Sequence, residues 1–286
     1  MLALALGPPR YLFGLVGEGT IFGSLDTQRE KGVMKQNLTK RRLREGGTVL
    51  GCWSRYGDAT LVEYVALQGW DFVVFDGEHG TLEPRDCENA VRAAELHDVT
   101  PLVRVTTNQA SIILRFMDTG AQGAHVPMVN SADEADQAVR AIKFGPRGSR
   151  GLAASRSAGF GQLGPYDAYV AHSNEETLVV VQIETPEAVA AVSDILAVDD
   201  VDVVFLGLTD LSQALGVPGQ TTHPYVERAA QAVAEVVTAS RAALGVLVAN
   251  AAAAIAWRDR GARYIAISLE GLIRDGSQAF QGAVRS

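Results

Sequence analysis

At residues 71–80 the chain reads Asp71-Phe72-Val73-Val74-Phe75-Asp76-Gly77-Glu78-His79-Gly80. The first half is apolar, β-branched and aromatic, which is typical of a strand buried on both faces. Two carboxylates and an imidazole follow on the turn that leaves this strand. Parallel strands deliver side chains to a site at their carboxyl ends. We therefore expect Asp76, Glu78 and His79 to lie where the protein does its chemistry.

Similar apolar runs recur from residue 48 onward and alternate with segments of helical periodicity. The expected strands are Thr48–Cys52, Phe72–Phe75, Pro101–Val105, Gly123–Val126, Leu178–Ile183, Val203–Leu206, Gly245–Val248 and Tyr264–Ile267. The expected helices, with apolar residues at i, i+3, i+4 and i+7, are Ala59–Gln68, Arg85–Leu96, Gln109–Asp118, Ala132–Ile142, Pro186–Leu196, Tyr225–Ala243 and Ala251–Arg260. A tail from Glu270 is expected to form a last helix.

This alternation, eight strands each followed by a helix, predicts a single-domain (β/α)₈ barrel in residues 34–286. A doubly wound sheet is the alternative, although such sheets usually have fewer strands. The segment from Phe144 to His172, rich in Gly, Ser and Arg, is expected to be a long loop that is functional or mobile. We interpret residues 1–33 as an N-terminal extension, either disordered or read from an upstream start codon.

Composition excludes several classes of protein. Of the 286 residues 47% are hydrophobic and 20% charged, as in soluble proteins with a sizeable core. The 25 Lys and Arg against 33 Asp and Glu give a formal charge of −8, which argues against a nucleic-acid partner. No apolar run approaches the roughly 20 residues of a membrane span. Cys52 and Cys87 lack CxxC spacing and are expected to be buried thiols in a reducing cytoplasm.

Two carboxylates, Glu184 and Asp210, follow neighbouring expected strands. Facing one space without a counter-charge, they would repel each other and raise one pKa. A hard divalent cation resolves this, because carboxylate oxygens suit Mg²⁺ or Mn²⁺. The alternative is that both are ordinary acids at helix starts, which Thr185-Pro186 and Ser212 make plausible.

The expected active site also includes a general base and a positively charged side chain. Histidine side chains suit general-base catalysis near neutral pH, which makes His79 a candidate base, although a lone His is more often structural. Arg104 closes an apolar strand, where its guanidinium would bind a carboxylate or a developing enolate oxygen, or else pair with a neighbouring acid. Asp118, at the end of the third helix, can orient an imidazole or be a surface cap.

Lysine is scarce: the four lysines are Lys31, Lys35, Lys40 and Lys143. The first three precede the expected barrel and Lys143 ends a helix, so no lysine is placed to form a Schiff base within it. If the protein is an enzyme that forms a carbanion beside a carbonyl, it must therefore stabilise the carbanion with a metal, since no lysine is placed to do so.

Taken together, the motifs resemble the HpcH/HpaI aldolase family, the metal-dependent class II pyruvate aldolases, over about residues 36 to 275. The matching segments, in family order, are Phe75-Asp76-Gly77-Glu78-His79-Gly80, Val103-Arg104, Met117-Asp118-Thr119-Gly120-Ala121-Gln122-Gly123, Val126-Pro127-Met128-Val129, Gly148-Ser149-Arg150-Gly151, Val181-Gln182-Ile183-Glu184-Thr185 and Thr209-Asp210-Leu211-Ser212.

The resemblance implies a (β/α)₈ barrel that cleaves 4-hydroxy-2-oxo acids to pyruvate and an aldehyde with a divalent cation, Mg²⁺ or Mn²⁺ or else Co²⁺. By the matching motifs, Glu184 and Asp210 would be the metal ligands. Arg104 would hold the keto oxygen as it becomes an enolate. His79, paired with Asp118, would act as the base, directly or through a water molecule.

The resemblance also assigns supporting roles and an assembly. Gln182 and backbone N–H groups near Leu208 and Thr209 would hold the pyruvate end, and Asp76 and Glu78 would support the residues that touch substrate. Members of the family are commonly hexamers, built as trimers of dimers with exchanged C-terminal helices. We therefore expect a cytoplasmic homo-oligomer whose partners are small 2-oxo acids and aldehydes.

Three segments depart from the family pattern: Gly207-Leu208 where Gly-Pro is usual, Ser268-Leu269-Glu270 in place of a more typical acidic turn, and Ala153 to Gln162 in the long loop. They lie near the expected substrate mouth and leave the aldehyde undefined. Alternatives within the family are oxaloacetate decarboxylation, cleavage of a CoA thioester and a macrophomate-synthase-like condensation. An alternative of another class is a barrel that has lost catalysis and serves as a binding or scaffolding subunit.

Overall fold

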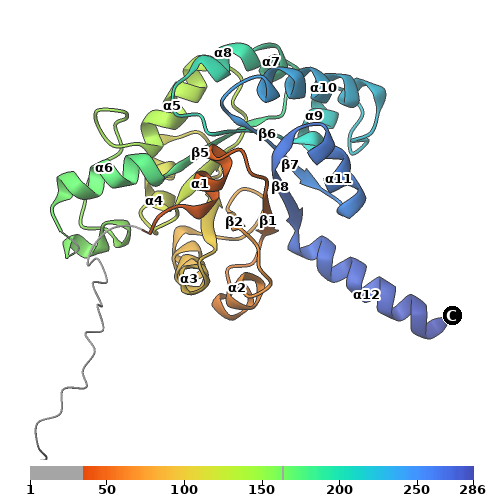
Figure 1. Ribbon diagram of the computed structural model, residues 1–286, viewed down its shortest axis with the longest axis horizontal. Coiled ribbons are helices and arrows are strands. Elements are labelled where there is room, and N and C mark those ends of the chain that lie inside the picture. Colours follow the sequence, from red (N-terminus) through yellow and green to blue (C-terminus); the bar gives the residue numbers. More distant parts are fainter. Residues whose placement is uncertain (1–34, 163) are drawn as a thin grey trace, which may run out of the picture. The chain divides into compact units, whose positions relative to one another are not determined.

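The computed structural model describes residues 35–162 and 164–286, and eight parallel strands form a closed barrel in chain order. Figure 1 shows the strands and the helices that follow them. The strands are β1 (Val49–Ser54), β2 (Phe72–Asp76), β3 (Thr100–Arg104), β4 (Gly123–Val126), β5 (Leu178–Ile183), β6 (Val203–Leu206), β7 (Ala243–Val248) and β8 (Ala262–Ser268). The predicted (β/α)₈ barrel is confirmed, and three of the eight predicted strands have the predicted bounds.

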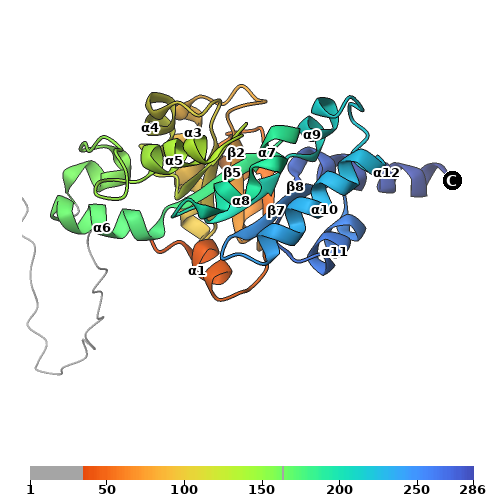
Figure 2. The ribbon, with the colours of Figure 1, turned by 90° about the horizontal axis from the view of Figure 1, so that it is seen from above.

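The helices lie around the strands, as the two views in Figures 1 and 2 show. They are α1 (Leu38–Arg44), α2 (Ala59–Ala66), α3 (Pro84–Ala94), α4 (Ala110–Met117), α5 (Ala132–Ile142), α6 (Tyr166–Glu176), α7 (Pro186–Ala190), α8 (Val192–Ala197), α9 (Leu208–Ala214), α10 (Pro224–Thr238), α11 (Ala251–Asp259) and α12 (Leu269–Arg285). Short 3₁₀ helices occur at Glu95–His97 (η1) and Arg156–Gly161 (η2).

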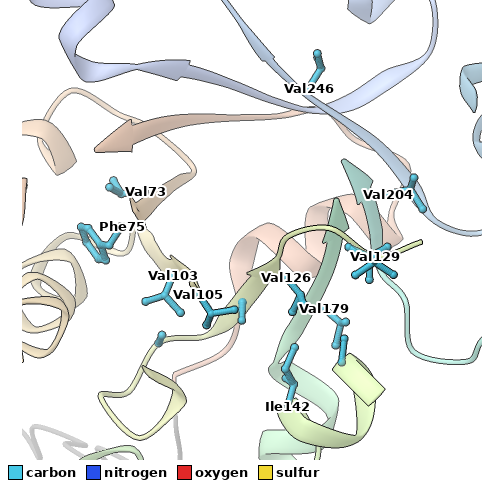
Figure 3. Packing of buried hydrophobic residues seen from close by; sticks show 14 of the residues in the cluster. Val73, Phe75, Val103, Val105, Val126, Val129, Ile142, Val179, Val204 and Val246 are labelled. Carbon is cyan, nitrogen blue, oxygen red and sulfur yellow. The ribbon is translucent and has the colours of Figure 1, made fainter. Parts of the chain in front are cut away.

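Successive side chains of each strand point alternately outward and inward, so the apolar core has two layers. Outward-facing residues such as Val73, Phe75 and Val103 pack against the helices (Figure 3). Residues between them, such as Phe72 and Val74, fill the barrel interior with a second apolar cluster. Strands buried on both faces explain why their sequences are continuously apolar rather than alternating.

Gly51 shows how tightly the barrel interior is filled. A Cβ at this position would lie 2.0 Å from the ring of Phe72, whose face stacks on Tyr264 with ring centroids 4.1 Å apart. The glycine thus provides the space that the two rings occupy. Above them, toward the carboxyl ends of the strands, polar residues replace apolar ones.

The expected long loop is partly helical. The segment from Phe144 to His172 contains η2 and most of α6, which was not predicted as a helix. Its helical pattern is weak, because only Tyr169, Ser173 and Asn174 of α6 are buried. The predicted helix Pro186–Leu196 is two helices, α7 and α8, which meet at Ala191.

The predicted extension, residues 1–33, lies outside the residues that the structure describes. The last helix, α12, is confirmed from Leu269, and its later turns extend away from the strands (Figures 1 and 2). Within residues 35–162 and 164–286, no helix combines the length and the hydropathy that a membrane crossing requires.

Candidate active site

A cavity of about 450 Å³ opens at the carboxyl ends of the strands. Its lining comes from the ends of several strands and from the turns that follow them, which is where barrel enzymes carry their chemistry. The polar residues of this lining are Arg55, Asp76, His79, Arg104, Gln182, Glu184, Thr209, Asp210, Thr221, Ser268, Glu270 and Arg274. Most of the residues predicted from the sequence are therefore brought together.

Asp76 organises one side of this cavity. It is the last residue of β2, it is buried, and its two oxygens accept five hydrogen bonds. The donors are the Trp53 indole at 3.2 Å, the backbone N–H groups of Glu78 and His79 at 3.0 and 3.2 Å, and Arg104 through two nitrogens. One carboxylate thus fixes both the guanidinium and the turn that carries His79. The supporting role expected for Asp76 stays a prediction.

Arg104 is held rigidly by two acids. Its Nε and Nη2 donate to Asp76 at 2.8 and 2.6 Å, and its Nη1 lies 2.9 Å from Glu78. Asp76 and Arg104 are register partners on β2 and β3, so the pairing follows from the strand alignment. Burial alone would raise the pKa of Asp76, but the hydrogen bonds and charge of Arg104 outweigh it and lower that pKa. Burial raises the pKa of Glu78, and Arg104 opposes the rise.

Glu184 is a buried carboxylate without a cationic partner among the described residues. It follows β5, and its Oε2 accepts the backbone N–H of Met128 at 2.9 Å. Met128, which donates this hydrogen bond, adopts a left-handed backbone with φ of 55°, an unfavourable conformation for a non-glycine residue. Burial raises the pKa of Glu184 to about 7, and the charges of Glu78 and Asp210 add to the rise, while the Met128 N–H and the charge of Arg104 oppose it.

Asp210 approaches Glu184 from the next strand along the barrel. It lies in the first turn of α9, directly after β6, and β6 pairs with β5 so that Leu206 is the register partner of Ile183. Gly207 makes this approach possible, since a Cβ there would lie 2.5 Å from Glu184 Oε1. The two acids line the same cavity and repel each other, as the sequence predicted.

These two carboxylates fit a hard divalent cation. Arg104 neutralises Asp76 and Glu78, whereas no described side chain forms an ion pair with Glu184 or Asp210. The uncompensated charge and the oxygen-only donor set are what Mg²⁺ or Mn²⁺ binds. Across the described ranges, no three His, Cys, Asp or Glu side chains are grouped as a metal site. A cation held by Glu184 and Asp210 would therefore keep positions open for other ligands.

Gln182, Leu208 and Thr209 also line the cavity. The amide of Gln182 is buried, and its Oε1 has no hydrogen-bond partner in the described part of the chain. Rotating this amide by 180° would present its N–H₂ group at the same place. Leu208 and Thr209 begin α9, where backbone N–H groups have no partner within the helix. All three can donate hydrogen bonds to an anionic group.

His79 and Asp118 are not brought together. His79 is exposed and lines the cavity, but Asp118 does not. Asp118 caps the end of α4, which runs back toward the amino end of β4, and its carboxylate accepts a hydrogen bond from Arg150 at 2.8 Å. The predicted pairing of His79 with Asp118 is thus absent within one described chain. The other interpretation of Asp118 is that it caps a helix. The structure agrees with this, because Asp118 ends α4 and forms an ion pair with Arg150.

The arginines of the long segment are occupied by acids. Arg147 pairs with Asp200, and Arg156 pairs with Glu95. Neither arginine lines the cavity. Their partners are remote in the sequence, and the sequence alone did not indicate these pairs.

The described lysines lie elsewhere as well. Lys35 contacts Asp98, while Lys40 and Lys143 are buried near the amino ends of the strands. None of the three lines the cavity. The prediction that no barrel lysine is placed for a Schiff base is confirmed for these residues.

Sequence reasoning missed a group of cavity residues at the ends of β1 and β8. Trp53 packs against the guanidinium of Arg104 at 4.9 Å, and Arg55 donates to Glu270 at 3.0 Å. Arg274 lines the same side of the cavity from α12. The departure of Ser268-Leu269-Glu270 from the usual turn was the signal that could have identified this side.

Comparisons with known proteins identify the family to which the chain belongs. The profile of the HpcH/HpaI aldolase/citrate lyase family matches residues 49–273. Over 236 residues the chain is 35% identical to a hydroxypyruvate/pyruvate aldolase of Roseobacter denitrificans, covering 82% of this chain and 91% of the relative. Over 238 residues it is 35% identical to a 4-hydroxy-2-oxovalerate aldolase of Rhodococcus jostii, covering 82% and 90%. A crystal structure of an HpcH/HpaI aldolase/citrate lyase family protein from Burkholderia cenocepacia superposes with a TM-score of 0.82 at 33% identity, covering 87% of this chain and all of the other.

Proposed function

Because the chain belongs to the HpcH/HpaI aldolase/citrate lyase family and its relatives are aldolases, it is a carbon–carbon lyase, and we propose that it is a divalent-metal-dependent one. Its substrate would be a 4-hydroxy-2-oxo acid, cleaved to pyruvate and an aldehyde. The observation that carries the proposal is the pair of uncompensated carboxylates, Glu184 and Asp210, in one cavity with the tethered guanidinium of Arg104.

Glu184 and Asp210 would hold the cation, with Mg²⁺ or Mn²⁺ preferred and Co²⁺ also suited to such a site. When bound, the cation would supply positive charge beside the oxygens of the 2-oxo acid, where negative charge develops. The N–H of Met128 keeps the Glu184 carboxylate oriented before any ligand arrives.

Arg104 would stabilise the developing enolate oxygen. Of its five N–H donors, Nε, one of Nη2 and one of Nη1 contact Asp76 and Glu78, which leaves two. The two acids fix the guanidinium in advance, so it need not reorganise as charge moves onto the pyruvyl oxygen. Such a group stabilises the transition state more than the ground state.

His79 would take the proton of the C4 hydroxyl. As that proton leaves, the C3–C4 bond breaks, C4 becomes the aldehyde carbonyl, and the electron pair remains on the pyruvyl fragment as an enolate. Protonation of C3 then gives pyruvate. Exposure of His79 at the cavity agrees with a group that exchanges protons with water. Its pairing with Asp118 stays a prediction that one chain does not fulfil.

Gln182 and the N–H groups of Leu208 and Thr209 would bind the carboxylate of the pyruvyl end. Each of these residues lines the cavity beside Glu184 and Asp210. This arrangement serves any reaction that forms the enolate of pyruvate. Oxaloacetate decarboxylation and a macrophomate-synthase-like condensation therefore remain alternative reactions for the same residues. Cleavage of a CoA thioester, in which the enolate forms on the thioester fragment, remains a third alternative.

The proposal is tested by measuring pyruvate release from a 4-hydroxy-2-oxo acid, from oxaloacetate and from a CoA thioester, with and without added Mg²⁺ or Mn²⁺. We expect metal-dependent release that is fastest from the hydroxy-oxo acid. Borohydride added with pyruvate should trap no adduct, because no described lysine reaches the cavity. A trapped lysine, or full activity in a chelator, would contradict the proposal, and no metal binding at all would favour a scaffolding subunit.

We also propose that the chain assembles as a homo-oligomer, with a hexamer expected. The support is α12, whose apolar residues Leu272, Ile273, Phe280 and Val284 are exposed. Light scattering of the purified protein measures the mass, and a monomer would contradict the proposal. A cytoplasmic location stays a prediction.

A further inference from the structure

The cavity has a second polar side that the reaction at Arg104, Glu184 and Asp210 does not use. β1 and β8 are neighbours in the closed barrel, with Trp53 the register partner of Ser268. Arg55 follows β1, and Glu270 lies in the first turn of α12, which follows β8. The turns after these strands therefore meet at one edge of the cavity.

Arg55 and Glu270 form a mixed donor and acceptor pair on this edge. Arg55 Nε donates to Glu270 Oε1 at 3.0 Å, which leaves four N–H donors of the guanidinium. Glu270 Oε2 is buried and has no hydrogen-bond partner in the described part of the chain. An ion pair with side chains 49% and 25% exposed contributes little to stability, so the fold does not require it.

An unsatisfied buried carboxylate oxygen indicates what this edge would bind. A hydroxyl group can donate to Glu270 Oε2 and can also accept from the free N–H groups of Arg55. A carboxylate would satisfy the arginine but would be repelled by Glu270, and an apolar group would leave Oε2 without a donor. Thr221 and Arg274 line the same cavity and add further polar groups.

We infer that Arg55 and Glu270 form the subsite for the aldehyde part of the substrate, and that this aldehyde carries a hydroxyl group beside its carbonyl. The inference rests on the proposed function, which places the pyruvyl carbons against Glu184 and Asp210. The chain beyond C4 then extends toward Arg55 and Glu270. In the synthetic direction, C3 of the pyruvate enolate bonds to the aldehyde carbon, and the aldehyde oxygen takes a proton to become the C4 hydroxyl.

The test compares aldehydes that differ by one group, using the full-length protein with Mg²⁺ or Mn²⁺ and pyruvate. Lactaldehyde and propionaldehyde differ only in the hydroxyl, and succinic semialdehyde supplies a carboxylate. We expect kcat/KM for lactaldehyde to exceed that for propionaldehyde by about 10- to 100-fold, the value of a hydrogen bond to a charged group. Equal values, or faster turnover of succinic semialdehyde, would overturn the inference.

Glu270→Met and Arg55→Met identify the residues responsible. Each should lower the lactaldehyde to propionaldehyde ratio toward one, mainly through the KM for the aldehyde. The matched control is Glu227→Met, which breaks another exposed ion pair, with Arg260, away from the cavity. An unchanged ratio in both variants would overturn the inference.

Deuterium exchange into the methyl group of pyruvate, followed by NMR, separates this inference from the proposed function. Exchange requires the enolate but no aldehyde, so in the unmodified protein it tests the proposed function without the subsite. Normal exchange without a preference for lactaldehyde would refute the subsite alone. Absence of metal-dependent exchange in the unmodified protein would refute the proposed function.

Discussion

The two ends of the barrel bury charge in opposite ways. At the amino end, Lys40 donates to Asp202 at 2.8 Å and to the Thr177 carbonyl at 2.7 Å. Burial and the nearby ammonium of Lys40 lower the pKa of Lys143 to about 6. Its Nζ still donates to Thr177 and to the Asn174 carbonyl. The two buried lysines there thus have partners within the fold.

At the carboxyl end, only part of the charge is paired. Asp76, Glu78 and Arg104 satisfy one another, but Glu184 and Asp210 face each other without a cation. Groups of one sign held in a cleft raise a pKa and are typical of a functional site. The paired end stabilises the fold, and the unpaired end is prepared for a ligand.

Cavity size does not distinguish the two ends. The amino end opens on a cavity of about 760 Å³, larger than the 450 Å³ of the candidate active site. Three of its acids, Asp199, Asp200 and Asp202, are bound by Arg241, Arg147 and Lys40. The smaller cavity is the functional candidate because its charge is uncompensated.

The largest expected effect follows from removing the unpaired acids. Glu184→Ala or Asp210→Ala should lower metal-dependent turnover by about 10³-fold or more, because the site loses a charge that acts on the transition state. Steady-state pyruvate release and metal titration by calorimetry measure the two losses. The fold should persist in circular dichroism. Retained activity in either variant would refute the ligand assignment.

His79→Ala should lower kcat by about 10²- to 10⁴-fold, the usual contribution of a general base. Metal affinity should stay unchanged, since His79 is not one of the two expected ligands. Rate measurements with saturating metal check the first point, and calorimetry checks the second. An unchanged kcat would remove His79 from this role.

Lys40→Met tests the opposite end. It leaves Asp202 without its cationic partner, and breaking a buried pair in this way costs about 3–5 kcal/mol of unfolding free energy. The kcat of the folded protein should not change, because Lys40 does not line the active-site cavity. Denaturant unfolding measures the loss, with Arg260→Met at an exposed pair as the control. A much lower kcat in the folded variant would contradict the conclusion that charges at the amino end stabilise the fold while those at the carboxyl end serve activity.

Glu184→Gln should stabilise the metal-free barrel by up to about 3 kcal/mol at pH 8. Burial raises the pKa of Glu184 from 4.5 to about 7, so the folded state binds a proton more tightly than the unfolded state. The unfavourable charge is therefore absent below pH 4.5, grows as the pH rises toward 7, and is constant above it. Unfolding at pH 4.5 and pH 8 in a chelator checks this. A gain that is the same at both pH values would contradict the assignment.

Much of the fold followed from local patterns. The apolar runs Phe72–Phe75, Leu178–Ile183 and Val203–Leu206 lie in strands whose two faces are both buried. Such a strand can be recognised from its own continuous apolar sequence, without knowing which strands lie beside it. The helix α6 was missed because its sequence lacks a clear apolar stripe. The break between α7 and α8 was missed because Ala191 interrupts the helix without glycine or proline to mark it.

The candidate site followed from position along the strands, and its contacts did not. Asp76, Glu184 and Asp210 each stand at or just after the end of a strand, and parallel strands bring such ends together. Asp118 shows the limit of this reasoning, because a residue at the end of a helix returns to the other end of the barrel and binds Arg150. The pairing of Arg55 with Glu270 joins residues 215 positions apart, which no local pattern encodes.

The sequence by itself determined the barrel, the edge at which its polar residues gather and the chemical type of those residues, because burial and strand direction act through local residue patterns. Only the tertiary structure decided that Arg104 is bound by two acids while Glu184 and Asp210 are left unpaired. That difference depends on strand register, on the space left by Gly207 and on burial from several strands at once. Electrostatic compensation is a property of neighbours in space, and the order of residues along the chain does not specify it.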